Sequence, residues 1–267
     1  MTLRRGHRGD EVVTWQRQLI RAGYSLEPYG ADGDFGMLTE LRTFQATGSV
    51  VVDAQAALAP LPEGLEGVTF VRARHFTPSS RTRIPLVVIH TAEVAEGSLS
   101  AEAVARFFAT TDRKASAHVC VDDTTLVECV MPASVAWAAP GANRHGYHYE
   151  LSGYARQSAA EWLDPFSRKM LDHAAWHAAR QALRYRVPLR WLDDGDFADF
   201  VRDPSCHPGG FTSHAVSARV GRNWQKWGLP KPRRTSDHWD PGPHFPAERF
   251  LELVAAEQTR LESRSCG

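Results

Sequence analysis

The sequence lacks a net charge, a long apolar run and a paired-cysteine motif. Lys and Arg together number 31, and so do Asp and Glu, so no charge excess indicates nucleic acid or an anionic membrane as a partner. No apolar run approaches the roughly 18 residues of a membrane span, and the opening segment MTLRRGHRGD lacks the apolar core of a signal peptide. We expect synthesis in the cytoplasm without an export signal, and a monomer that binds neither nucleic acid nor membrane.

The cysteines form no CxxC pair; they are Cys120, Cys129, Cys206 and Cys266. Without a secretion signal they are interpreted as free thiols, although Cys120 and Cys129 can face each other across a hairpin as two thiols or as a disulfide. Histidine and tryptophan, by contrast, are frequent, at 12 and 8 residues. Both types occur where metals, sugars or peptides are handled, so the histidines are the first candidates for chemistry.

The first 58 residues have the pattern of a small helical unit. VVTWQRQLIRAG predicts one helix, a glycine-rich turn follows, MLTELRTFQ predicts a second, and DAQAALA (53–59) a short third. Through LRRGHRGDEVVTWQRQL and DGDFGMLTELRTFQ, residues 3–58 resemble the peptidoglycan-binding domain 1 family. The resemblance implies a three-helix wall-binding domain over residues 1–60; a helical bundle with an unrelated partner is the alternative.

The segment APLPEGLEG, residues 59–67, is rich in proline and glycine and predicts a linker to a second domain over 68–267. In that domain IPLVVIH, the two halves of SAHVCVDDTTLVECV, and YHYEL predict strands, while helices are expected at 100–110, 167–185 and 247–263. This mixture predicts an α/β (α+β) fold, with a central mixed sheet flanked by helices.

Several side chains are candidate metal ligands on their pattern alone. His173 and His177 share a helix face, but the motif HAAWH lacks the glutamate of an HExxH metalloprotease and sits among apolar residues, which favours packing over zinc binding. His90 ends a buried strand, where a sheet can hold a catalytic group, or a structural one, rigidly. His214 follows a glycine pair, and Asp240 precedes a Pro-Gly turn; each is ambiguous by itself.

The order of five motifs is more specific than any one of them. VVIHTAE, SAHVCVDD, NRHGYHYEL, GGFTSHA and DHWDPGPHFP resemble the amidase 2 family of zinc N-acetylmuramoyl-L-alanine amidases over about residues 83–255. The resemblance implies Zn2+ held by His90, His214 and Asp240. The separation between the last two is longer than is usual in the family, so His207 and Cys206 are the alternatives to His214.

The same resemblance implies two catalytic helpers. Glu150 corresponds to the family's glutamate, a proton acceptor and donor, with a solvent-facing strand residue as the alternative. His238 stands where the family commonly has a lysine that stabilises the oxyanion. His118 is interpreted as structural, and Asp237 and His244 as bystanders.

These expectations combine into one function and two alternatives. The leading hypothesis is a zinc amidase that cleaves the bond between N-acetylmuramic acid and L-alanine in bacterial peptidoglycan, used as a phage endolysin for host cytolysis. The alternatives are a metal-free peptidoglycan-binding protein and a zinc peptidase cutting within the stem peptide. The long separation between His214 and Asp240 indicates an inserted loop between Val216 and Ser236. It carries Trp224 and Trp227, which either line a glycan groove or fold back on the domain.

Overall fold

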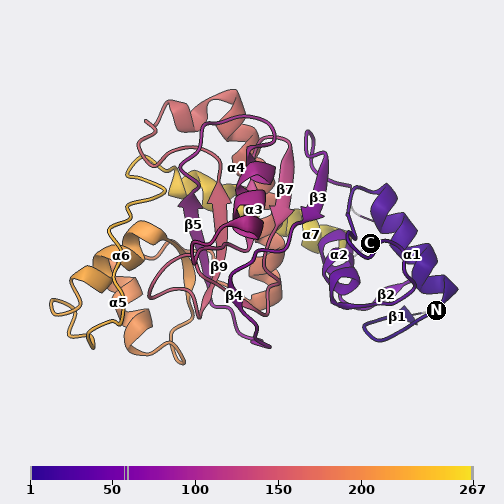
Figure 1. The fold of residues 1–267 in the computed structure, drawn as a ribbon, viewed down its shortest axis with the longest axis horizontal. Coiled ribbons are helices and arrows are strands. Elements are labelled where there is room, and N and C mark those ends of the chain that lie inside the picture. The colour runs from indigo at the N-terminus through magenta and orange to yellow at the C-terminus, as the bar shows by residue number, and fades with distance from the viewer. Residues whose placement is uncertain (1, 57, 59, 266–267) are drawn as a thin grey trace.

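The computed structural model describes residues 2–56, 58 and 60–265 (Figure 1). Its centre is a six-stranded mixed sheet in the order β10-β5-β9-β6-β7-β3. Strands β10, β5, β9 and β6 run parallel, β7 pairs antiparallel with β6, and β3 runs parallel to β7. The strand bounds are β3 (Gly67–Phe70), β5 (Leu86–Thr91), β6 (Val119–Val121), β7 (Thr125–Glu128), β9 (Gly146–Leu151) and β10 (Gly210–Ser213). The predicted mixed sheet flanked by helices is confirmed.

Helices cover both faces of this sheet, and the alternation of β5 shows which residues face which layer. Val87 and Ile89 belong to the core beneath α4 and α7, whereas Leu86 and Val88 belong to the core beneath α5 and α6. Helix α3 covers the neighbouring strands β6 and β7. The helix bounds are α3 (Ser100–Thr110), α4 (Pro165–Tyr185), α5 (Asp194–Arg202), α6 (His214–Arg222), α7 (Ala247–Ser265) and the 3-10 turn η1 (Glu161–Leu163). A separate ribbon joins β4 (Phe76–Thr77) to β8 (Val135–Ala136).

The N-terminal unit contains helices α1 (Asp10–Arg21) and α2 (Met37–Thr47) and a ribbon of β1 (Thr2–Leu3) with β2 (Val52–Asp53). The third helix predicted over 53–59 is wrong for the residues that the structure describes there. Val52 and Asp53 pair with β1 instead, and the Asp53 carboxylate accepts a hydrogen bond from the Gln55 N–H, which starts a turn. Local strand pairing therefore replaces the helix that the alanines favour.

The N-terminal unit is joined to the central sheet and shares its core (Figure 1). The backbone of residues 23–25 extends the sheet edge: Val68 of β3 donates to the Gly23 carbonyl, and Ser25 donates to the Val68 carbonyl. Tyr24 packs near Trp176 of α4 with ring centroids 6.4 Å apart. In the predicted linker, Leu65 is buried, so that part of the segment packs on the domain as well.

A buried polar cluster crosses the same boundary. Arg42 of α2 forms an ion pair with Glu128 of β7. Gln45 donates to Glu128 at 2.7 Å, and His177 of α4 lies 3.2 Å from the same carboxylate. Tyr149 completes the cluster at 2.7 Å from His177. All five side chains are buried, so the polar groups on both sides depend on each other for partners.

His173 and His177, interpreted as surface or core residues rather than zinc ligands, lie in the core. Both are fully buried, and His173 lies within 3.3 Å of the Asp122 carbonyl oxygen. Cys120 and Cys129 are buried free thiols whose sulfur atoms lie 3.8 Å apart, and Cys206 is free and exposed; Cys266 lies outside the described residues. Within the described part of the chain, no helix is both long enough and apolar enough to cross a membrane.

Candidate metal centre

The predicted ligands converge because the sheet register places them side by side. His90 lies near the carboxyl end of β5 and on the face shared with Leu86 and Val88, under α5 and α6. Ser213 of β10 pairs with Ile89, so the next residue, His214, emerges beside His90 as the first residue of α6. The end of a parallel sheet thus holds both imidazoles rigidly.

Asp240 reaches the same place on a returning loop. Its backbone carbonyl accepts a hydrogen bond from the Ala215 N–H at 2.9 Å, one of the free donors in the first turn of α6. Gly242 closes the turn, with φ of +92°, and a Cβ there would lie 1.8 Å from the Ala155 carbonyl oxygen. The Pro-Gly pair therefore fixes the carboxylate by a contact that only glycine permits.

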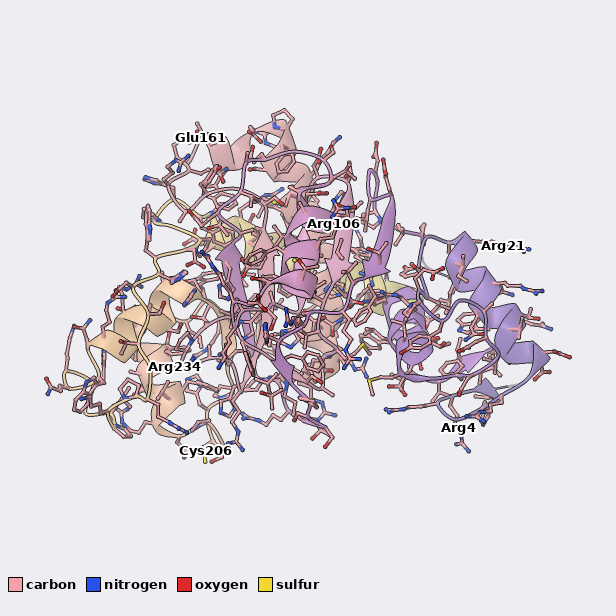
Figure 2. The ribbon with its side chains drawn as sticks, viewed as in Figure 1. Arg4, Arg21, Arg106, Glu161, Cys206 and Arg234 are labelled. Atoms are coloured by element: carbon pink, nitrogen blue, oxygen red, sulfur yellow. The ribbon has the colours of Figure 1, made fainter. Side chains whose placement is uncertain are left out.

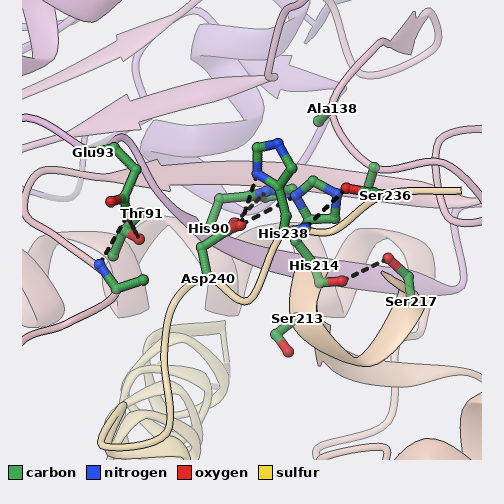
Figure 3. A network of polar contacts seen from close by, with 12 residues as sticks. His90, Thr91, Glu93, Ala138, Ser213, His214, Ser217, Ser236, His238 and Asp240 are labelled. Atoms are coloured by element: carbon green, nitrogen blue, oxygen red, sulfur yellow. Dashed lines mark hydrogen bonds and ion pairs between the residues drawn. The ribbon is translucent and has the colours of Figure 1, made fainter. Parts of the chain in front are cut away.

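The three side chains form a compact, buried group (Figure 3). His90 Nδ1 lies 3.0 Å from Asp240 Oδ2, and His214 Nδ1 lies 3.3 Å from Asp240 Oδ1. One ligand atom from each residue lies within 4.8 Å of the others. Tetrahedral zinc with bonds of about 2.0–2.2 Å separates its ligand atoms by about 3.3 Å, so this donor set suits the ion.

The electrostatics of Asp240 and His214 are those of metal ligands. Burial opposes ionisation of Asp240, but hydrogen bonds from His214, His238 and His90 outweigh it and hold its pKa far below the usual range. Burial lowers the pKa of His214 to about 4, so its imidazole is neutral at pH 7, as coordination requires. Among the residues that the structure describes, this is the one group of three or more such side chains close enough to hold a metal.

The alternatives to His214 lie elsewhere. His207 lies 3.0 Å from the Arg190 guanidinium, and Cys206 is exposed. Figure 2 places Cys206 at the periphery of the domain. Neither belongs to the group with His90 and Asp240.

Glu150 and His238 line the same groove as the three ligands, which has a volume of about 1540 Å3. Glu150 pairs in register with His90 on the adjacent strand β9. Burial raises its pKa well above the usual value, and repulsion from Asp240 and Glu93 adds to this. A carboxyl with a raised pKa can accept and return a proton near neutral pH.

His238 lies directly over the ligand pair. Its Nδ1 is 3.2 Å from Asp240 Oδ1, and its ring stacks on His214 with centroids 4.4 Å apart. The hydrogen bond to Asp240 raises its pKa, which favours the charged form of the imidazole. Its neighbour Asp237 is 98 % exposed and pairs with Arg222 at 3.7 Å, while His244 is exposed.

One residue that sequence reasoning missed is His148. It is fully buried, and its Nδ1 lies 3.1 Å from Nε2 of His90, the nitrogen that faces away from Asp240. A Cβ on Gly146 would lie 2.7 Å from the His148 ring, so glycine leaves room for it. The alternation of GYHYEL, which puts His148 on the same face as Glu150, is the signal that could have found it. His118, predicted to be structural, is buried behind it and accepts from the His148 N–H at 3.0 Å.

The inserted segment after His214 divides into two parts. Trp224 and Trp227 are partly buried against the core of α5 and α6, so they fold back on the domain. Residues 232–236 instead line the groove. Part of the predicted loop, up to Arg222, is helix α6.

Residues 80–243 match the family model Amidase_2, described as N-acetylmuramoyl-L-alanine amidase. The solved Staphylococcus aureus hydrolase AmiA, in complex with its ligand, has a TM-score of 0.51 at 14% identity, over 75% of this chain and 85% of that chain. A selenomethionine derivative of AmpD has a TM-score of 0.45 at 19% identity, over 73% and 99%. The amidase LysC from Clostridium intestinale has 0.41 at 14%, over 70% and 97%.

Comparison with curated proteins gave no match. The likeness to AmiA shows a shared fold, and the family model covers more than half of the chain. The protein therefore belongs to the Amidase_2 family of N-acetylmuramoyl-L-alanine amidases.

Proposed function

We propose that the protein is a zinc-dependent hydrolase of peptidoglycan that cleaves the amide between N-acetylmuramic acid and the L-alanine of the stem peptide. The buried group of His90, His214 and Asp240, open to a large groove with Glu150 beside it, carries this proposal. Three protein ligands leave one coordination position open, which is typical of catalytic rather than structural zinc. The donor set, two imidazoles and one carboxylate, is one that zinc accepts.

Each residue has a task that follows from its place. His90, His214 and Asp240 would hold Zn2+, which when bound supplies a Lewis acid and lowers the pKa of water. Glu150 takes the proton of the attacking water and passes it to the leaving amine of L-alanine.

His238 donates a hydrogen bond to the carbonyl oxygen as negative charge develops there. His148 holds the His90 ring through Nε2, which leaves Nδ1 as the nitrogen that would serve as the ligand atom. The substrate amide is thereby held between a proton acceptor on the sheet and a donor on the returning loop.

The proposal extends to the N-terminal unit and to the biological setting. The motifs of residues 3–58 support wall binding by a domain spanning residues 1–60, beside a hydrolase domain over 68–267. Such binding raises the local concentration of substrate. A wall-binding unit joined to an amidase suits a phage endolysin, and lysis of the bacterial host is the role we propose.

Metal analysis of the purified protein tests whether His90, His214 and Asp240 bind zinc. We expect about one zinc per chain in the unaltered protein and strongly reduced zinc in His90→Ala and Asp240→Asn, each with a native circular dichroism spectrum. His244→Ala is the matched control, because His244 belongs to the same motif but is exposed. Near-zero zinc in the unaltered protein, together with binding to peptidoglycan, would instead support a binding protein without catalysis.

A further inference from the structure

Four cationic side chains line the same groove as the candidate metal centre. Arg113 and Lys114 follow helix α3, and Arg233 and Arg234 belong to the inserted segment. All four are exposed, and in the described part of the chain none has a carboxylate partner. The positive charges therefore face the groove without an internal counter-charge.

The inserted segment holds its two arginines in place by anchors on either side. Leu229 is buried and donates its N–H to the Trp224 carbonyl at 2.9 Å. Beyond the arginines, the Ser236 carbonyl accepts a hydrogen bond from Arg222 of α6. Between these anchors, Pro230 and Pro232 restrict the backbone. The arginines therefore lie on a stiffened segment, residues 229–236, which we call the strap.

The nearby acidic side chains do not cancel this charge. Asp112 is 91 % exposed and pairs with Arg74 at 2.7 Å, and Asp237 pairs with Arg222. The carboxylates that line the groove, Glu93, Glu150 and Asp240, belong to the metal end. Because the whole chain has no net charge, a concentration of cations at one groove indicates an anionic ligand there.

We propose that Arg233 and Arg234, together with Arg113 and Lys114 of the same groove, make the enzyme selective for stem peptides that carry free carboxylates. The inference rests on the proposed function, since it requires the peptide beyond the cleaved amide to lie along this groove. Arginine pairs with a carboxylate through two parallel hydrogen bonds, whereas an amide in its place offers only one acceptor and no charge. The enzyme would therefore select the free acid form of the peptide over its amidated form.

An anionic phosphate polymer of the cell wall is the competing ligand for the same cations. The position of the cations favours the peptide, because they line the cavity that contains His90 and Glu150. Figure 2 shows Arg234 at the opposite end of the molecule from Arg4 and Arg21 of the N-terminal unit. A contact made for substrate selection belongs beside the reacting bond, whereas general wall adhesion does not.

The test uses two matched probes and three forms of the full-length protein. The probes are N-acetylmuramyl-L-alanyl-D-glutamate and the same compound with the glutamate α-carboxylate amidated. The proteins are the unaltered chain, Arg233→Gln/Arg234→Gln, and Lys231→Gln, which removes an exposed charge of the same strap that does not line the groove. Binding is measured by calorimetry, and KM and kcat are measured separately.

We expect the unaltered protein to bind the free acid more tightly, and the double variant to weaken that binding and raise KM roughly fivefold to tenfold without a matching change in kcat. Binding of the amidated probe should change less than roughly twofold, and Lys231→Gln should behave like the unaltered protein. Raised salt should weaken binding of the free acid.

Equal loss for both probes, or no loss, would overturn the inference. Loss of binding to a glycerol-phosphate oligomer, with the two peptide probes unaffected, would overturn it in favour of a wall polyanion. Calorimetry separates this failure from failure of the proposed function. Selective binding without cleavage of the amide contradicts only the proposed reaction. Cleavage without selectivity contradicts only the role inferred for the four cations.

Discussion

Arg42 of α2 and Glu128 of β7 form an ion pair in which the side chains are 0% and 1% exposed. The pair joins the N-terminal unit to the sheet that carries the candidate metal centre. Removing one partner leaves the other charged and buried, which costs about 3–5 kcal/mol. We therefore expect Arg42→Met to lower the free energy of unfolding by about that amount in urea titrations. The double variant Arg42→Met/Glu128→Leu should recover much of the loss, and additive losses would contradict a coupled pair.

Deletion of residues 1–60 should destabilise the remaining chain. The deletion removes the partner of Glu128 and uncovers Trp176 and the outer edge of β3, and an uncovered strand edge promotes aggregation. We expect a lower melting temperature and concentration-dependent aggregation by light scattering. A truncated protein as stable as the full chain would show that the two units fold independently, as the proline-rich segment 59–67 suggests.

Low pH should weaken the contact between the N-terminal unit and the central sheet. Burial opposes ionisation of Glu128, but Arg42 and His177 outweigh it and lower its pKa; burial also lowers the pKa of His177. The unfolded chain therefore takes up protons that the folded chain does not. Stability should fall as pH drops below about 6.5, where the unfolded histidine titrates, and fall further below about 4.3, where the unfolded glutamate does.

Unfolding in urea at a series of pH values checks this, with His177→Gln as the comparison. Glutamine keeps a hydrogen-bonding side chain but does not titrate, so the variant should lose part of the slope between about pH 6.5 and 5. Other buried histidines, such as His118 and His148, whose pKa values are also lowered by burial, supply the slope that remains. An unchanged slope in the variant would contradict the assignment to His177.

His148 should affect metal affinity rather than the fold of the groove. Its Nδ1 lies 3.1 Å from His90 Nε2, and partners of this kind typically change metal affinity about 10–100-fold when they are removed. We expect His148→Ala to weaken zinc binding in competition with a chelator by that factor, while His148→Asn retains part of it. Zinc affinity equal to that of the unaltered protein in His148→Ala would show that the contact does not orient His90.

The strand end at His90 and the Pro-Gly turn after Asp240 could be recognised in the sequence, but neither residue could be assigned a role from its neighbours alone. The order of the motifs, through the resemblance to the amidase 2 family, implied that both are ligands, and the structure brings them to within 3.0 Å. Contacts between distant segments could not be predicted. The Arg42–Glu128 pair joins residues 86 positions apart, and no periodicity in either segment indicates it. The prediction of a third N-terminal helix was wrong for a related reason. Val52 pairs with β1 at the other end of the unit, and local sequence does not indicate this pairing.

The central claim is the bond that the enzyme cleaves, and mass spectrometry of purified peptidoglycan after digestion tests it most directly. We predict glycan strands with intact N-acetylmuramic acid and peptides with new L-alanine amino ends, and we predict that both products are lost in Glu150→Gln. New ends further along the stem peptide, or no release at all by the zinc-loaded protein, would contradict it.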